Sequence, residues 1–169
     1  MKAFFFDTSA LVSRYCADNA TNRINRILAK GDSQFYISEL TLIEMSSSLA
    51  QIRRRQHLGV AEFQRMRNLF EDDIASGLLR VRTITQGDLL NARDLLEDAA
   101  VLKNCDLRSA DAIIAASCRE LAHALKSRIC FYTKDWKQYS SVYHVYAYRS
   151  ALKLRFIGKG KGGIPARSG

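Results

Sequence analysis

The sequence has few of the features that indicate a secreted, membrane or zinc-binding protein. Four cysteines have neither the close pairing of a disulfide framework nor the spacing of metal ligands: Cys16, Cys105, Cys118 and Cys130. They lie among apolar neighbours and are typical of small core residues in a reducing compartment. No apolar run reaches the length of a membrane span, and Lys2 with only four apolar residues after it does not resemble a signal peptide. We therefore expect a cytoplasmic protein that does not enter a membrane.

The composition is that of an ordinary globular protein with an excess of positive charge. Of its 169 residues, 47% are hydrophobic and 25% are charged, which suits one domain with a substantial core. Basic residues outnumber acidic ones by 26 to 17, so the formal net charge is +9. Such a protein attracts polyanions over long range, and nucleic acid or an acidic protein is the expected partner. The function then depends on whether acidic residues gather within this positive background.

Strands and helices are predicted to alternate along the chain. Strands are predicted at residues 3–6, 34–37, 79–83, 129–132 and 142–148, with dense apolar runs at 3–6 and 129–132. Amphipathic spacing predicts helices at residues 9–15, 18–30, 39–57, 60–76, 88–103 and 107–121. This alternation is typical of an α/β fold in which a parallel sheet carries helices on both faces. No internal repeat is visible.

The last twenty residues differ from the rest of the chain. Leu152, Leu154 and Phe156 alternate with basic residues, which is the pattern of an exposed edge strand. Residues 158–169 are rich in glycine, and we expect this segment to be disordered. We therefore divide the chain into a main domain at residues 1–148 and a basic, glycine-rich, partly disordered tail at residues 149–169.

Four acidic residues lie where such a fold would place a functional site. Asp7 and Asp135 follow apolar strands, at the carboxyl ends where open α/β sheets bind ligands. Glu44 and Asp111 share helix faces with apolar residues, where an unpaired carboxylate is costly. Each also has an ordinary interpretation, because aspartates commonly cap helices and glutamates are commonly solvated. For Asp111, the functional interpretation is favoured.

Other charged residues are expected to have ordinary surface roles. Three consecutive basic residues end the helix at 39–57: Arg53, Arg54 and Arg55. They spread about 200° around the helix axis, which favours a solvated helix end over an RNA contact, although RNA contact stays an alternative. Asp72 and Asp73 are expected to be surface charges, and Asp106 is expected to cap the helix that follows it.

A cluster of the four acids would favour a divalent cation. Two carboxylates about 4 Å apart repel by roughly 4 kcal/mol at an effective dielectric near 20, so the cluster needs protons or cations at neutral pH. Oxygen ligands without histidine or cysteine select Mg²⁺ or Mn²⁺, and these ions act on phosphates. A divalent ion can lower the pKa of a bound water and stabilise both the attacking and the leaving oxygen of a phosphodiester.

Four segments resemble, in order, the motifs of the PIN-domain family. They are FFDTSAL at residues 5–11, SELTLIE at 38–44, LRSADAIIAA at 107–116 and TKDW at 133–136. In particular they resemble the VapC-type toxins of bacterial toxin–antitoxin pairs, over about residues 1–148. The resemblance implies a three-layer PIN-like fold with four or five parallel strands, and a Mg²⁺- or Mn²⁺-dependent endoribonuclease that cleaves RNA. It also implies a homodimer and a small antitoxin as inhibitory partner.

The resemblance assigns site residues by their positions in these motifs. Asp7, Glu44 and Asp111 match the three core metal-site acids of the family, and Asp135 matches a more variable fourth. Thr8 or Ser9 matches the hydroxyl that helps orient the site, and two further hydroxyl residues are expected to support it: Ser109 and Thr133. The residues after about 149 exceed the usual length of the family, and the resemblance gives them no role.

Two other functions are consistent with parts of the pattern. A PIN-like module that holds RNA or protein without cleaving it is the main alternative, and the presence of all four acids argues against it. A phosphatase that uses Asp7 as its nucleophile is the other. That chemistry requires a second aspartate two residues later, where this chain has Ser9.

Overall fold

Five parallel strands form one sheet in the order β3-β2-β1-β4-β5. The computed structural model describes residues 2–101, 106–135 and 152–156. The strands are β1 (Lys2–Phe6), β2 (Ser33–Ser38), β3 (Leu79–Arg82), β4 (Ile129–Thr133) and β5 (Leu152–Phe156). The predicted α/β class and the parallel sheet of four to five strands are confirmed.

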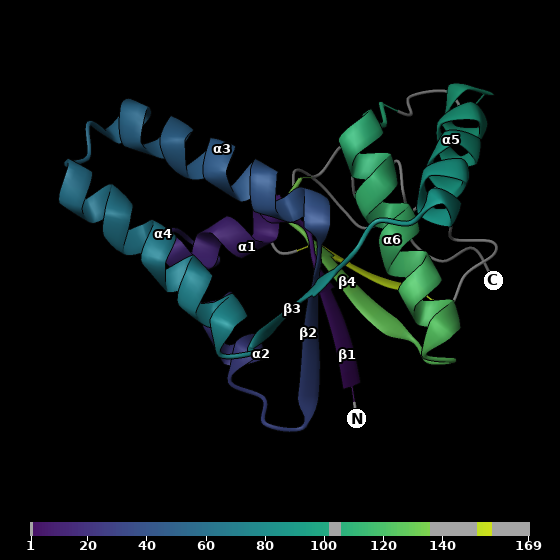
Figure 1. Cartoon of the computed structure of the whole chain (residues 1–169), viewed down its shortest axis with the longest axis horizontal. Helices are drawn as coiled ribbons and strands as arrows, with labels where there is room; N and C mark the ends of the chain where they lie inside the picture. Colours follow the sequence, from purple (N-terminus) through teal and green to yellow (C-terminus); the bar gives the residue numbers. More distant parts are fainter. Residues whose placement is uncertain (1, 102–105, 136–151, 157–169) are drawn as a thin grey trace.

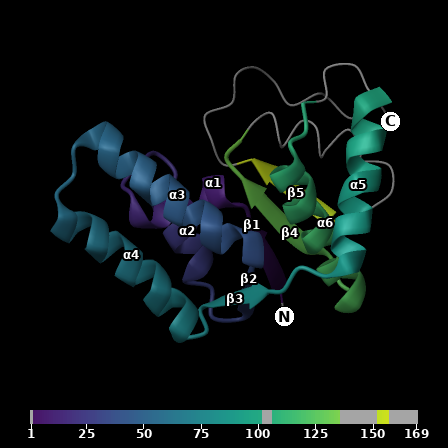
Figure 2. The same cartoon turned by 45° about the horizontal axis from the view of Figure 1, so that its top comes forward.

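Helices cover both faces of the sheet (Figure 1). They are α1 (Thr8–Tyr15), α2 (Thr21–Leu28), α3 (Glu39–Gln56), α4 (Val60–Ala75), α5 (Gln86–Val101) and α6 (Ser109–Ala124). Helices α3 and α4 form a long pair on one side, and α5 and α6 form a second pair on the other, as the turned view in Figure 2 also shows. None of the helices in the described ranges is both long and apolar enough to span a bilayer.

Strand β1 is the centre of the core because its side chains point alternately to the two faces of the sheet. Phe4 and Phe6 pack among buried residues of α1, α2, α3 and α4, whereas Ala3 and Phe5 pack against α6. A separate cluster of mostly alanine side chains joins α5 to α6. A short apolar run at the start of the chain thus becomes the strand that both helical layers cover.

Most elements match the sequence prediction to within a few residues at each end. The predicted edge strand at 152–156 is β5, which pairs in parallel with β4 at the edge of the sheet. The strand predicted at 142–148 and the disorder predicted at 158–169 fall outside the described residues. The boundary placed at residue 148 stays a prediction.

The prediction that Asp106 caps the following helix is wrong. Helix α6 begins at Ser109 with Arg108, not Asp106, as its N-cap, and the Arg108 side chain does not form a cap hydrogen bond. The chain is extended through Arg108, yet Leu107 already packs against the cluster between α5 and α6. The apolar pattern therefore begins before the helix does, and for this reason the start of the helix was predicted too early in the sequence.

The prediction that Asp73 is a surface charge is also wrong. Only 8% of Asp73 is exposed, and it accepts hydrogen bonds from Nε and Nη2 of Arg14, at 2.5 and 2.7 Å, and from the Tyr15 hydroxyl at 2.7 Å. Burial and the bond to Asp73 raise the pKa of the Tyr15 phenol. Because Arg14 and Tyr15 belong to α1 and Asp73 to α4, this network ties the two helices together. Its neighbour Asp72 is exposed, as predicted.

Replacement of Asp73 by asparagine is expected to destabilise the fold by about 2–4 kcal/mol, because the Arg14 guanidinium loses its charged partner in a partly buried place. The adjacent substitution Asp72→Asn, also at α4, removes the same charge from an exposed position and should change stability by less than about 0.5 kcal/mol. Urea denaturation of both variants measures the difference. Equal stabilities would show that the network contributes nothing.

Candidate functional site

Asp7 lies directly after β1 and has two roles in the structure. It is the N-cap of α1, and only 4% of its surface is exposed. Its Oδ2 accepts hydrogen bonds from the Ser9 amide at 3.1 Å, the Ser9 hydroxyl at 2.5 Å and the Thr133 hydroxyl at 3.1 Å. The same side chain also lines a pocket at the carboxyl edge of the sheet. The cap and the site were alternative interpretations of the sequence, and the structure gives Asp7 both positions.

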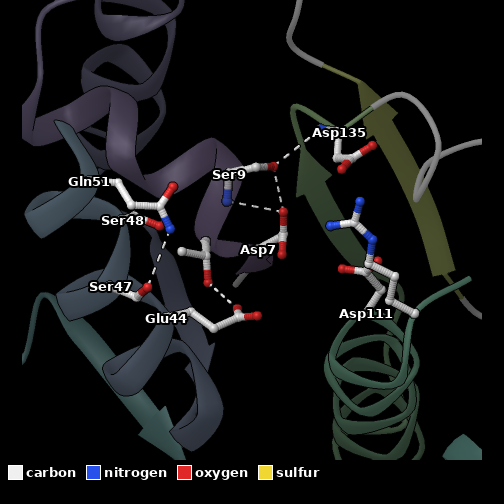
Figure 3. Close-up of a pocket in the computed structure, with 10 residues that line it drawn as sticks. Asp7, Ser9, Glu44, Ser47, Ser48, Gln51, Asp111 and Asp135 are labelled. Atoms are coloured by element: carbon white, nitrogen blue, oxygen red, sulfur yellow. Dashed lines mark hydrogen bonds between the residues drawn. The ribbon is translucent and has the colours of Figure 1, made fainter. Parts of the chain in front are cut away.

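The Ser9 hydroxyl connects Asp7 to the loop after β4. Besides donating to Asp7, it accepts the amide hydrogens of Lys134 at 2.9 Å and Asp135 at 3.2 Å. The Asp135 amide also donates to the Thr133 hydroxyl at 3.0 Å. These bonds hold the start of the loop that carries Asp135 against the start of α1 (Figure 3).

The Lys134 side chain fastens the same loop on its other side. Its Nζ forms an ion pair with Asp18 in the connection between α1 and α2. Asp18 also accepts a hydrogen bond from the buried Ser13 hydroxyl at 2.8 Å. These contacts lower the pKa of Asp18 against the effect of its burial. The backbone around Asp135 is thus held at both ends of α1.

Glu44 reaches the pocket from α3. Its Oε2 accepts a hydrogen bond of 2.5 Å from the Thr8 hydroxyl, the residue directly after Asp7. Consecutive hydroxyl residues therefore have separate roles, since Thr8 orients Glu44 and Ser9 orients Asp7 and the loop of Asp135. The sequence had left open which of the two would support the site. The face that Glu44 shares is less buried than predicted, because Ile43 on the same stripe is 70% exposed.

Asp111 completes the group from the opposite wall, in the first turn of α6. Figure 3 shows Glu44 on the α3 side, Asp111 on the α6 side and Asp7 between them, with Asp135 near the end of β4. All four acids line one pocket of about 310 Å³. The other lining residues are Thr8, Ser9, Ser47, Ser48, Gln51 and Arg108.

Burial and mutual repulsion keep protons on this group. Burial first, and then the charges of Asp7, Asp135 and Glu44, raise the pKa of Asp111 to about 7. Burial and the charge of Asp7 also raise the pKa of Glu44, although the bond from Thr8 opposes this. The shared cause is negative charge in a partly desolvated space, which a proton or a cation relieves.

The donor set fits a hard divalent cation by its chemistry. Its four carboxylates are oxygen ligands, and no histidine or cysteine lines the pocket among the residues that the structure describes. As the side chains are placed, no three acidic, histidine or cysteine residues of the described ranges lie close enough to hold one ion together. Burial and the charges of the neighbouring acids both raise the pKa of Asp111, and a cation beside it would favour its ionised form.

Several predicted residues lie apart from the pocket. Thr133 is buried beneath it and acts on Asp7 through the hydrogen bond described above. Ser109 is exposed at the first position of α6 and is not among the lining residues. The three arginines at the end of α3 are exposed and also lie outside the lining. The guanidinium of one of them, Arg53, lies 5.7 Å from the centre of the Phe63 ring on α4.

Four lining residues were not predicted as site residues, although the sequence placed one of them, Ser47, on the same helix face as Glu44. Ser47, Ser48 and Gln51 follow Glu44 at intervals of three, four and seven, so helical periodicity places them on its face of α3. The Gln51 amide donates to the Ser47 hydroxyl at 3.4 Å. The fourth, Arg108, precedes Asp111 by three residues, and that spacing was the available signal.

Comparisons with known proteins agree with this architecture. The sequence matches the model of the PIN domain over residues 4–142. It matches none of the curated proteins. Among solved structures, VapBC2 from Rickettsia felis bound to a promoter DNA fragment is 17% identical, with a TM-score of 0.59 over 91% of this chain and 98% of that one.

Two further structures share the fold at low identity. A toxin–antitoxin complex from Klebsiella pneumoniae is 17% identical, with a TM-score of 0.52 over 89% of this chain and 95% of that one. VapC20 from Mycobacterium tuberculosis, a toxin that cleaves the sarcin–ricin loop, is 18% identical, with a TM-score of 0.55 over 82% of this chain and 94% of that one. The family model covers most of the sequence, and the four segments that resemble PIN-domain motifs each place an acid in the same pocket. The chain therefore belongs to the PIN-domain family.

Proposed function

We propose that the protein is a divalent-metal-dependent endoribonuclease that cleaves RNA phosphodiester bonds. The observation that carries the proposal is the convergence of Asp7, Glu44, Asp111 and Asp135 on one pocket of a protein with net charge +9. The positive surface attracts a polyanion, and the acidic pocket requires a cation before a phosphate can enter. Mg²⁺ or Mn²⁺ is the proposed cofactor, because the ligands are all oxygens.

The residues at the pocket have two proposed roles: some bind the metal ion, and others orient the carboxylates that bind it. Asp7, Glu44, Asp111 and Asp135 are the proposed metal ligands and catalytic acids, and they would draw together on a cation. When bound, the ion would supply charge stabilisation and an activated water. Ser9 and Thr133 fix the orientation of Asp7, and Thr8 fixes that of Glu44. Such preorganisation removes the need to reorient these dipoles during the reaction.

We further propose that this nuclease is the toxin of a toxin–antitoxin pair in the cytoplasm. Two of the structural neighbours are described as toxin–antitoxin assemblies or VapBC, and a third as an RNA-cleaving toxin. An antitoxin or a second copy of the chain would contact α3 and α4, where three apolar side chains are exposed: Ile43, Val60 and Leu69. Contact of Arg53, Arg54 and Arg55 with RNA stays a weaker expectation.

Replacement of Asp7 by asparagine is expected to reduce RNA cleavage at least about 100-fold, because one charged ligand of the proposed metal site is lost. Asparagine is also a good N-cap, so α1 should be retained. The assay uses end-labelled single-stranded RNA with Mg²⁺ or Mn²⁺, and with chelator, which should abolish cleavage by the wild type. Asp98→Asn on the exposed side of α5 removes one acid elsewhere and is the matched control. Full activity of Asp7→Asn would refute the metal-site assignment.

Without metal, Asp111→Asn is expected to stabilise the protein above pH 7 by about 1–2 kcal/mol, a Coulomb estimate reduced for solvent screening. The pKa of Asp111 is about 7 in the fold, above its unfolded value near 4. The folded wild type therefore gains stability as pH falls from above 7 toward 4, and the advantage of the variant shrinks over that range.

Thermal melts at several pH values, with chelator and with Mg²⁺, measure both effects. Mg²⁺ should raise the melting temperature of the wild type and raise that of the variant much less, since the ion binds only the folded state. Asp98→Asn again serves as the control and should respond to Mg²⁺ as the wild type does. A wild-type melt that is independent of both pH and Mg²⁺ would contradict the charge cluster.

If this protein is such a toxin, its gene should lie beside one for a small protein, and co-expression of the two is expected to give a stable complex in which RNA cleavage is inhibited. A basic side chain of the partner could bridge two pocket carboxylates, while its apolar residues cover α3 and α4. Ile43→Ser, at a side chain that is 70% exposed on α3, should weaken copurification. Val101→Ser alters a side chain that is 83% exposed on α5 and should leave the complex intact. Failure to find any complex would remove the toxin assignment and leave the nuclease assignment standing.

A further inference from the structure

Arg108 is a positive charge among the acids of the pocket. Of the residues that line it within the described ranges, Arg108 is the only one with a cationic side chain. Its charge favours the ionised form of Asp111, so the two groups are within electrostatic range. Even so, the Arg108 guanidinium forms no ion pair or hydrogen bond with any residue of the described ranges.

Two partly buried arginines of the fold, Arg14 and Arg82, are bound to carboxylates. Arg14 donates two hydrogen bonds to Asp73, and Arg82 donates to Asp88 at 2.7 Å and to the Ser117 hydroxyl at 2.6 Å. Those guanidinium groups join helices to each other or to the sheet, and their donors are used in these hydrogen bonds. Arg108 differs, because it is exposed and its donors are available to a ligand.

The backbone of Arg108 is nevertheless fixed. As N-cap of α6 it has extended torsion angles, and its carbonyl accepts the Ala112 amide hydrogen at 2.9 Å. Its side chain does not cap the helix. The main chain of Arg108 is therefore fixed at the pocket, three residues before Asp111. Its guanidinium has no hydrogen-bonding partner among the described residues.

We propose that Arg108 binds a phosphate of the RNA strand as the strand enters the pocket, an inference that rests on the proposed nuclease function. A phosphodiester that approaches four carboxylates is repelled unless positive charge lies beside them. A guanidinium provides two parallel N–H donors that match the non-bridging oxygens of a phosphate. Ser47, Ser48 and Gln51 on α3 form the facing wall and are uncharged. The strand would thus pass between the polar face of α3 and the charged N-terminal end of α6.

The competing role for Arg108 is to neutralise Asp111 without touching RNA. The two roles differ in the salt dependence of RNA binding, because each phosphate contact to a single strand contributes about 0.7 to the slope of log K against log salt concentration. Binding is measured with fluorescent single-stranded RNA and the inactive Asp7→Asn protein as the parent, so that the RNA stays intact. The parent is compared with the same protein carrying Arg108→Ala, Arg108→Lys or Arg128→Ala.

Arg128 is the matched control because it is exposed and precedes β4, at the end of the strand opposite to the pocket. Arg108→Ala should lower the salt slope by about 0.7 for RNAs of different sequence, whereas Arg108→Lys and Arg128→Ala should keep it. In the active protein, Arg108→Ala should reduce kcat/KM about 10- to 100-fold, as expected for loss of a charge-assisted pair of hydrogen bonds. The kcat/KM of Arg108→Lys should lie between those of the wild type and Arg108→Ala, since lysine keeps the charge but lacks the two parallel N–H donors of the guanidinium.

An unchanged salt slope for Arg108→Ala would overturn the proposal, even if the thermal stability of the protein or the pKa of Asp111 changed. This result would leave the nuclease assignment intact as long as the wild type cleaves RNA. Failure of the wild type to bind or cleave any RNA with Mg²⁺ or Mn²⁺ would instead refute the proposed function, and the role of Arg108 with it. Circular dichroism of each variant confirms that the fold is retained.

Discussion

The parallel pairing of β1 with β4 is the contact on which the site depends. Phe6 is the register partner of Tyr132, and the Asp7 amide donates to the Tyr132 carbonyl at 2.9 Å. Because the two strands run in the same direction, their carboxyl ends meet at one edge of the sheet. Asp7 and Thr133 thereby become neighbours, although 126 positions separate them in the sequence. A shift of this register by one residue would turn the side chains of the strand to the opposite face and disperse the site.

The acids at this edge are supported unequally. Asp7 and Glu44 accept hydrogen bonds from hydroxyl groups of α1, which restrict their orientation. Asp111 accepts none from the described residues, and it is the group whose pKa rises to about 7. Burial first, and then the repulsion of the neighbouring acids, therefore acts most strongly on Asp111, on the wall that α6 provides. A cation that enters the pocket at neutral pH must compete there with a proton, so that metal binding and protonation of Asp111 oppose each other.

The sequence allowed much of this to be predicted, because the relevant signals are local. An apolar run followed by an acid predicted β1 and Asp7, and helical spacing placed Glu44 and Asp111 on inward faces of their helices. The errors concern contacts between distant segments. Asp73 belongs to α4 and its partners to α1, 58 and 59 positions away, and no local pattern distinguishes it from the exposed Asp72. The start of α6 was misplaced for a similar reason, since Leu107 packs against the α5–α6 cluster before the helix begins.

The charges of this protein act over two different ranges. The excess of basic residues attracts a polyanion from a distance, but at about 0.1 M salt that attraction is screened beyond roughly 10 Å. Within the pocket the nearest charges are the four carboxylates, which screening weakens far less because they are partly buried. A basic surface therefore cannot by itself bring a phosphate into contact with the acids. Positive charge must lie beside the acids, either as a bound cation or on a lining residue, and among the described residues that line the pocket only Arg108 has a cationic side chain. Without a cation, the acids would repel a phosphate that the basic surface attracts from a distance.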